Sequence, residues 1–251
     1  MIYLTGDLHG STKRLSVKIF PEQREMTKDD YVIICGDFGV IWEQDHESDS
    51  ERYLLDELDH RSFTTLFVDG NHENFNRIFA YPIEEWHGGM VHKIRPSVLH
   101  LMRGQVYEIE GATIFSFGGA SSHDIEGGIL ESDDPDFKRK KKQLDRDNIR
   151  YRINRITWWE RELPTEEEME EGRRNLAAHN NVVDYIVTHC CATSTQDIIG
   201  EGRYAPDVLT DYLEEIKKTV DYKKWFFGHY HDNKNISETE LLLYEQIIRI
   251  R

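Results

Sequence analysis

Five short apolar segments of this chain each end abruptly in small residues and in residues that can bind metal. The segments are rich in β-branched and aromatic side chains, which is typical of strands buried on both faces of a sheet. They cover residues 2–5, 31–35, 65–68, 185–188 and 225–227. Helix-like patterns, for example at residues 50–58 and 206–219, lie between them. This alternation of strand and helix patterns predicts an α/β fold.

The residues that follow these segments are aspartate, asparagine and histidine, which are common metal ligands. In α/β sheets, ligands bind beyond the carboxyl ends of the strands, where the loops converge. We therefore expect these side chains to meet at one site. A single Gly-Asp or His-x-His pair would carry little weight, because such pairs are common in turns and cores. The candidate site residues are Asp7, His9, Asp37, Asn71, His72, His189, His229 and His231.

The middle of the chain has a different pattern. Residues 106–110 and 112–116 predict an antiparallel hairpin. Residues 121–180 are polar and contain few strand signals, although residues 166–171 and 176–178 favour helix. No proline-rich linker or internal repeat divides the chain. We therefore expect one domain over residues 1–251, with a polar and basic insertion at about residues 121–180.

The composition limits the classes of function. The formal net charge is −16, so a polyanion would be repelled over most of the surface, although a metal site would be locally positive. No apolar run approaches the ~20 residues of a membrane span, and the first residues lack a signal-peptide pattern. We therefore expect a cytoplasmic protein, with no membrane contact and no evident obligate protein partner. The three cysteines (Cys35, Cys190 and Cys191) favour small buried side chains over a disulfide framework.

The candidate site residues fall into five blocks in a specific order. The blocks read G-D-L-H from Gly6, G-D from Gly36, G-N-H-E from Gly70, a lone His189, and G-H-Y-H from Gly228. In order and spacing they resemble the calcineurin-like metallophosphoesterase superfamily. Compact bacterial and phage members are similar in a further respect, since they share Gly-Asp-Phe-Gly in the second block, a later Gly-Gly-Ala, and Trp-Trp ahead of acidic residues.

The resemblance implies a fold and a chemistry. The fold is a four-layer sandwich of two mixed β-sheets flanked by helices, and the activity is metal-dependent hydrolysis of a phosphate ester. The nucleophile is a hydroxide that bridges two divalent transition-metal ions, with Mn favoured and Fe, Zn or Ni as alternatives. His72 is the general acid, and Asp37 bridges the two ions. By the resemblance, the first ion takes Asp7, His9, Asp37 and His231, and the second takes Asp37, Asn71, His189 and His229.

The second block departs from the protein Ser/Thr phosphatases of the superfamily. Val40 and Ile41 stand where those enzymes have an aspartate that orients the catalytic histidine and an arginine that binds phosphate. Glu43 and Asp45 lie nearby, and either is a candidate to orient His72. The missing pair favours a phosphodiester or nucleotide-type substrate over a phosphoprotein. The alternatives are a small-molecule phosphomonoesterase and a non-catalytic metal-binding scaffold for a protein partner.

Residues 138–155 contain nine basic residues against only Asp145 and Asp147. They are either a solvated helix that compensates its acidic neighbours, or an electropositive edge beside the metals that recruits a nucleotide or nucleic acid. For the adjacent Trp158 and Trp159 we expect core packing rather than base stacking, because tryptophan side chains are mostly buried. His123 and Asp124 either reach the site or belong to a polar turn.

Overall fold

The computed structural model describes all 251 residues, and its first sheet has seven strands in the order β15-β1-β2-β3-β6-β5-β4. The four central strands β1, β2, β3 and β6 are parallel, whereas the pairs at both edges are antiparallel. The sheet is therefore mixed. Its strands are β1 (Ile2–Thr5), β2 (Tyr31–Ile34), β3 (Thr64–Phe67), β4 (Ile83–Trp86), β5 (Gly89–Arg95), β6 (Val98–Leu101) and β15 (Ile247–Arg249).

The second sheet has six strands in the order β13-β14-β12-β11-β8-β7. It is mixed as well, because β14, β12, β11 and β8 are parallel and both edge pairs are antiparallel. Two further strands, β9 (Ile129–Leu130) and β10 (Arg152–Ile153), form a separate parallel pair. The strands of the second sheet are β7 (Gln105–Ile109), β8 (Ala112–Phe117), β11 (Val182–Thr188), β12 (Asp221–Phe227), β13 (Lys234–Asn235) and β14 (Glu240–Leu242).

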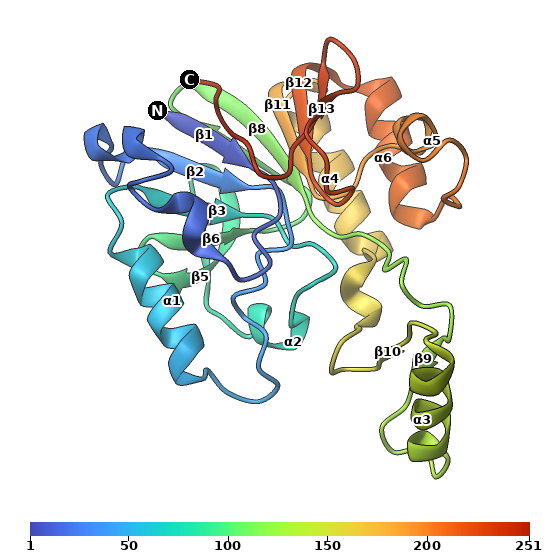
Figure 1. Cartoon of the computed structure of the whole chain (residues 1–251). Helices are drawn as coiled ribbons and strands as arrows, with labels where there is room; N and C mark the ends of the chain where they lie inside the picture. The colour runs from blue at the N-terminus through green and yellow to red at the C-terminus, as the bar shows by residue number, and fades with distance from the viewer.

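Helices cover the outer face of each sheet, with α1 beside the first sheet and α4, α5 and α6 beside the second (Figure 1). None of the helices combines the length and the apolar character that spanning a bilayer would require. The α-helices are α1 (Asp49–Asp59), α2 (Phe75–Ile78), α3 (Phe137–Asp147), α4 (Glu166–Ala178), α5 (Thr193–Gly200) and α6 (Val208–Thr219). The 3₁₀ turns are η1 (Thr12–Leu15), η2 (Pro21–Glu25) and η3 (Glu160–Glu162).

Three apolar clusters hold the layers together. The central one joins the facing sides of the two sheets and includes Leu4, Ile33 and Phe226. A second lies between the first sheet and α1, and a third between the second sheet and helices α4 and α6. Fully burying one aliphatic side chain contributes roughly 1.5–3 kcal/mol, so these clusters dominate the stability of the fold. The expected four-layer α/β sandwich is therefore confirmed.

The local predictions agree with this architecture. The five apolar segments are β1, β2, β3, β11 and β12, and the predicted hairpin is β7–β8. The predicted helices are α1, α4 and α6. Helix α1 begins at Asp49 because Ser48 caps it, with the Glu51 side chain accepting a hydrogen bond from the Ser48 backbone. All three cysteines are buried and unpaired, as expected.

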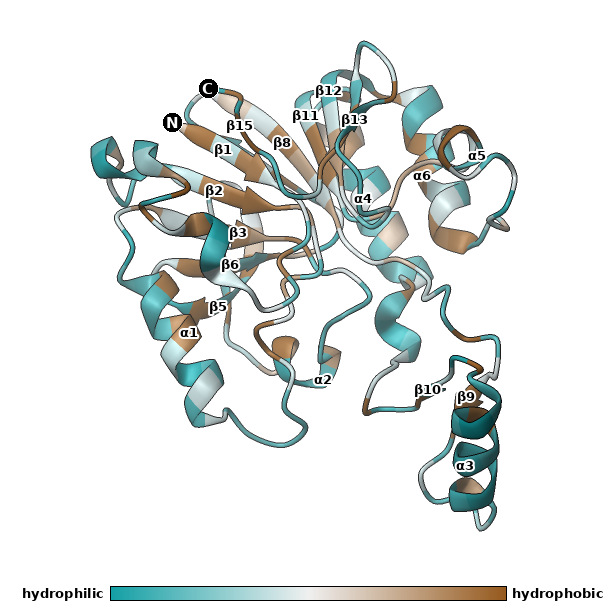
Figure 2. Cartoon of the chain, in the orientation of Figure 1, coloured by the Kyte–Doolittle hydropathy of each residue, from teal (hydrophilic) through white to brown (hydrophobic).

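Residues 121–180 divide into two parts in space. Helix α4 packs on the second sheet and buries Met169 and Leu176 in its cluster. The segment with β9, β10 and α3 instead protrudes from the body (Figure 1). Helix α3 buries no residue and is mostly hydrophilic along its length (Figure 2). The basic helix is therefore a solvated arm, whereas α4 is part of the outer helical layer.

Two buried histidines pair across β5 and β6. His92 and His100 are register partners, their Nδ1 atoms lie 3.0 Å apart, and the rings stack. His100 also bonds through Nε2 to Asp69, at 3.0 Å. Burial, together with the neighbouring His100, lowers the pKa of His92 to about 4. The folded protein therefore resists protonation of His92.

This pair predicts an acid-sensitive contribution to stability. Between pH 6.5 and about 4, the unfolded chain binds a proton at His92 before the folded chain does, so the free energy of unfolding falls as the pH falls. We expect this group to remove about 1–2 kcal/mol between pH 7 and 5. The variant His92→Gln should lose less stability over this interval in urea unfolding with EDTA present. An unchanged gap between parent and variant at the two pH values would exclude the effect.

Candidate metal centre

The loops after five parallel strands converge at one edge of the sandwich (Figure 1). They follow β1, β2 and β3 of the first sheet, and β11 and β12 of the second. Four of the candidate ligands have left-handed backbone conformations: φ is 46° at His9, 43° at Asp37, 72° at His229 and 50° at His231. Such conformations are uncommon outside glycine and cluster at functional sites. The loops are therefore held in strained conformations where the candidate ligands lie.

Among the candidate ligands, four have donor atoms that lie within 4.8 Å of one another: Asp7, His9, Asp37 and His231. The Nε2 atoms of His9 and His231 lie 3.0 Å apart. Two ligands at right angles, each about 2.1 Å from one ion, are about 3 Å apart, so the spacing suits a shared metal ion. The Oδ2 atom of Asp7 lies 3.2 Å from His231 Nε2, and the Oδ2 atom of Asp37 lies 3.6 Å from His9 Nε2. These are the four residues that the resemblance assigns to the first ion.

Asp37 also faces a second group of ligands. Its Oδ1 atom lies 3.3 Å from His189 Nε2, and the His189 and His229 rings are 5.0 Å apart. Asn71 belongs to the same pocket as Asp37 and His229. The Asn71 amide donates through Nδ2 to Ser122 Oγ, which leaves its Oδ1 oxygen free to accept or to bind a cation. The two oxygens of Asp37 thus point to two different sets of residues.

Unpartnered buried atoms support a metal at both sets. Asp7 Oδ2, Asn71 Oδ1, His189 Nε2 and His229 Nε2 are buried and make no hydrogen bond, and the only close contacts of Asp7 Oδ2 and His189 Nε2 are with other candidate ligands. Leaving one such atom unsatisfied costs about 1–3 kcal/mol. Four of them in one place, all of types that bind transition metals, fit a site built for cations. The donor set therefore fits divalent metal ions.

Close backbone approach brings the ligands together. A Cβ atom at Gly36 would lie 2.1 Å from His189 Nδ1, and one at Gly70 would lie 2.1 Å from Asp37 Oδ1. Both distances are far inside van der Waals contact, so only glycine permits this packing. The glycines of the motif blocks are thus required by the ligands that approach them.

The charges of the site are strongly coupled. Burial opposes ionisation of Asp37, but the nearby His189 outweighs it and holds the pKa of Asp37 well below its usual range. Burial likewise opposes protonation of His189, yet the Asp37 and Asp7 carboxylates raise its pKa to about 10. Burial lowers the pKa of His229 well below its usual value. Without a metal, a proton on His189 therefore supplies part of the positive charge that the carboxylates need.

His72 stands in the same pocket but not among the four clustered ligands. Its backbone N–H donates to Asp37 Oδ1 at 2.9 Å, and its ring stacks on Trp42. Its Nε2 atom lies 3.3 Å from a guanidinium nitrogen of Arg152. Because arginine has only donors, this contact requires an unprotonated Nε2. Burial is the main cause that lowers the pKa of His72, and Arg152 adds to it.

An open pocket of about 380 Å³ lies over these residues. Its rim includes His123, Asp124, Arg150 and Tyr204. The His123 ring lies 4.5 Å from the Tyr204 ring and 5.1 Å from the His229 ring, measured between centroids. Both His123 and Asp124 therefore reach the site.

Other expectations about the surroundings are corrected. Neither Glu43 nor Asp45 bonds to the His72 ring; Arg152 lies against it instead. The basic run at 138–155 is split, because two of its five arginines, Arg150 and Arg152, line the pocket whereas its other basic residues do not. Lys140 and Lys141 lie on α3, where they pair with Asp134 and Asp145.

The aromatic and apolar side chains near the site serve the core. Val40 and Ile41 are buried in the cluster under the first sheet, so no charged pair occupies their positions. Trp159 is 2% exposed and packs against Trp42 and Phe75. The expectation of core packing is therefore confirmed for Trp159, whereas Trp158 is only half-buried.

Sequence patterns did not reveal several supporting residues. Glu73 is fully buried and accepts hydrogen bonds from the Phe38 and Gly39 backbone, which ties the third block to the second. Asp69 accepts from Arg103, a guanidinium that also reaches the Arg161 carbonyl. Glu73 could have been noticed because it closes the third motif block. Arg103 lies outside all five blocks, so no motif points to it.

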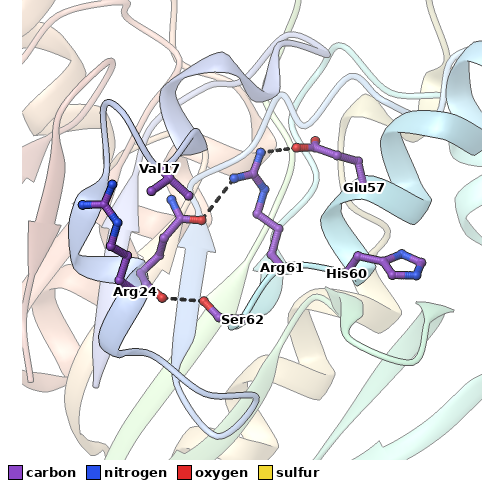
Figure 3. Close-up of a pocket in the computed structure, with 7 residues that line it drawn as sticks. Val17, Arg24, Glu57, His60, Arg61 and Ser62 are labelled. Atoms are coloured by element: carbon purple, nitrogen blue, oxygen red, sulfur yellow. Dashed lines mark hydrogen bonds and ion pairs between the residues drawn. The ribbon is translucent and has the colours of Figure 1, made fainter.

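A second hollow, of about 420 Å³, lies beside η2 and the end of α1. Arg61 projects into it and bonds to Glu57 and to Gln23, as Figure 3 shows. None of its seven lining residues belongs to the candidate metal centre. The Arg61 guanidinium is already paired with protein groups, so this hollow has no cluster of unpaired ligands like that of the candidate metal centre.

Comparison with protein families gives a match that spans most of the chain. The model of the calcineurin-like phosphoesterases matches residues 1–233. No curated protein matches the chain. The match includes all five motif blocks and every strand of the two sheets except β13, β14 and β15, and the clustered Asp7, His9, Asp37 and His231 could hold a metal ion. The chain therefore belongs to the calcineurin-like phosphoesterases and is a metal-dependent hydrolase that acts on phosphoric ester bonds.

Proposed function

We propose that this hydrolase cleaves a phosphodiester or nucleotide-type phosphate ester at a centre of two divalent metal ions. One observation carries the proposal: a single open pocket of about 380 Å³ joins four of the candidate metal ligands (Asp37, Asn71, His229 and His231), two arginines and a pair of aromatic rings. Metal ligands and arginines suit a phosphoryl group, and the rings of His123 and Tyr204 suit a planar leaving group.

Two sets of residues would hold the metals. Asp7, His9, Asp37 and His231 would hold one ion, and Asp37, Asn71, His189 and His229 the other. Mixed imidazole and carboxylate ligands suit Mn, Fe, Zn or Ni better than Ca or Mg, and Mn is our first choice. When bound, the ions would supply a water acidic enough to attack the ester near neutral pH, together with positive charge for the phosphoryl group.

His72 is the candidate general acid. Its ring lies in the pocket beside the clustered ligands, with the His9 ring 5.1 Å away. In the substrate-free arrangement its Nε2 atom accepts from Arg152. A phosphate anion is a better acceptor for a guanidinium than a neutral imidazole, so substrate would compete for Arg152 and free Nε2. The imidazole would then be free to take up a proton at Nε2 and to donate it to the leaving oxygen.

A small phosphomonoester is the second candidate substrate. Arg152 supports it, because an arginine in the pocket weakens the argument drawn from the missing arginine at Ile41. The open pocket and its aromatic rim still favour a larger ester. The rival scaffold function is disfavoured, because neither ligand set lacks a residue and the pocket is open to a ligand.

Metal content tests the two-ion centre. After reconstitution with Mn²⁺, we expect close to two ions per chain by elemental analysis, because seven ligands exceed what one ion needs. Asp37→Asn should lower the metal content and abolish activity more completely than His231→Ala, because only Asp37 belongs to both sets. Asp49→Asn, at a side chain that is 98% exposed, is the matched control. Saturation at one ion per chain would contradict the bridging role.

The leaving group tests His72. A general acid contributes about 10²–10⁴-fold when the leaving oxygen is a poor one. His72→Ala should therefore strongly reduce kcat on a nucleoside or alkyl ester, and only mildly on p-nitrophenyl phosphate. Steady-state assays of both substrates with parent and variant give the comparison. Equal losses on the two substrates would remove His72 from this role.

Substrate preference tests the proposed function itself. We expect kcat/KM on bis-p-nitrophenyl phosphate and on a dinucleotide to exceed kcat/KM on a phosphoserine peptide by at least about tenfold, a difference of about 1.4 kcal/mol in activation free energy. The assay uses the Mn²⁺-loaded protein. A preference for the peptide would overturn the substrate class, and a Mn²⁺-loaded protein without turnover on any ester would favour the scaffold.

A further inference from the structure

One arginine of the protruding segment reaches back to the metal centre. Arg152 lies on β10, which pairs with β9. Its backbone N–H donates to the Gly128 carbonyl at 3.2 Å, and the neighbouring Arg150 carbonyl accepts from Gly127 at 2.8 Å. The Arg152 side chain is only 12% exposed. The β9–β10 pair therefore fixes the backbone from which this side chain enters the pocket.

The guanidinium of Arg152 is oriented on several sides. Its Nε donates to Asp124 Oδ1 at 2.8 Å, and Nη2 lies 2.7 Å from Asp124 Oδ2, which makes a two-point ion pair. Nη1 donates to the Thr157 carbonyl at 3.3 Å, and Nη2 lies 3.3 Å from His72 Nε2. Arginine has five N–H donors, so one on Nη1 remains without a protein acceptor. The contact to His72 joins a donor to a neutral acceptor and is the easiest to replace.

We propose that Arg152 binds the phosphoryl group of the substrate and that Asp124 positions it. This inference rests on the proposed function and adds a substrate contact to it. The ligand chemistry is a phosphate oxygen, whether of an ester or of inorganic phosphate. The planar guanidinium suits such an oxygen, because charge-assisted bonds from arginine are short and directional.

The position of Arg152 argues against a purely structural ion pair. The same pocket is lined by Asp37, Asn71, His72, His229 and His231, so the cation faces the candidate metal ligands. Its neighbour Arg150 also lines the pocket, but its side chain is 67% exposed and pairs with Glu126 at the rim. Of the two, only Arg152 is held in one orientation beside His72.

The roles of the two residues differ. Arg152 is the group that touches substrate, whereas Asp124 acts through it by fixing the plane of the guanidinium. When phosphate takes the Nη2 donor, His72 Nε2 loses its partner and faces the leaving oxygen. Substrate binding and release of His72 are then the same event.

The test measures phosphate binding and turnover in four variants of the Mn²⁺-loaded protein. Arg152→Gln should weaken binding of inorganic phosphate in calorimetry, and raise KM for bis-p-nitrophenyl phosphate, by about 10- to 100-fold, as expected for loss of one charged hydrogen bond. Arg152→Lys should show a smaller loss, because it keeps the charge but not the fork. Asp124→Asn should weaken binding by about threefold, and by almost nothing further when combined with Arg152→Gln.

The control and the opposing outcomes are distinct. Arg146→Gln removes the same charge from an exposed site on α3 and should leave binding and metal content unchanged. If Arg152→Gln proves unstable by its thermal midpoint, Arg152→Lys carries the test. Phosphate affinity and KM within twofold of the parent in the folded variant would overturn the inference while the proposed function stands. Phosphate binding that depends on Arg152, without turnover of any ester, would instead overturn the proposed function alone.

Discussion

The buried carboxylate of Asp37 is the contact around which the two halves of the sandwich are arranged. It follows β2 of the first sheet, yet its Oδ1 atom lies 3.3 Å from His189, which follows β11 of the second. The same oxygen accepts the backbone N–H of His72, so it also fixes the loop after β3. A charge buried this deeply is tolerated only when it is paired or binds a metal. The loops of both sheets therefore have to meet at Asp37.

The free-energy cost of bringing the ligands together is offset by contacts outside the site. Left-handed backbone at four candidate ligands and four unpartnered buried atoms oppose the folded state. The apolar cluster between the sheets and the clusters under the helices stabilise it. Behind the loops, Glu73 holds the backbone after Asp37, and the Asp69–Arg103 pair links the loop after β3 to η3. These buried hydrogen bonds and ion pairs thus hold the ligand-bearing loops in place.

Only part of the protruding segment contributes to the site, because residues near β10 line the pocket and those of α3 do not. Helix α3 carries most of the positive charge, but it is solvated, and two of its four lysines pair with nearby acids. The short β9–β10 pair carries fewer charges, yet it directs Arg152 to the pocket. Local charge density is therefore a poor guide to which residues line the pocket, because charged side chains on a solvated helix pair with nearby acids instead.

The residues alone predict seven of the fifteen strands, the polar residues that follow five of them, and the order of the five motif blocks. These are local properties: apolar runs bounded by glycine predict strands, and the ends of parallel strands converge. The strand ends predict where the site lies, and the resemblance carried by the ordered blocks names the candidate ligands within it. The surroundings of these ligands are seen only in the folded chain. Arg152 contacts His72 from 80 residues away in the sequence, and Ser122 contacts Asn71 from 51 residues away. No periodicity or motif encodes such contacts, because they arise when separate elements pack, and the packing depends on the whole chain.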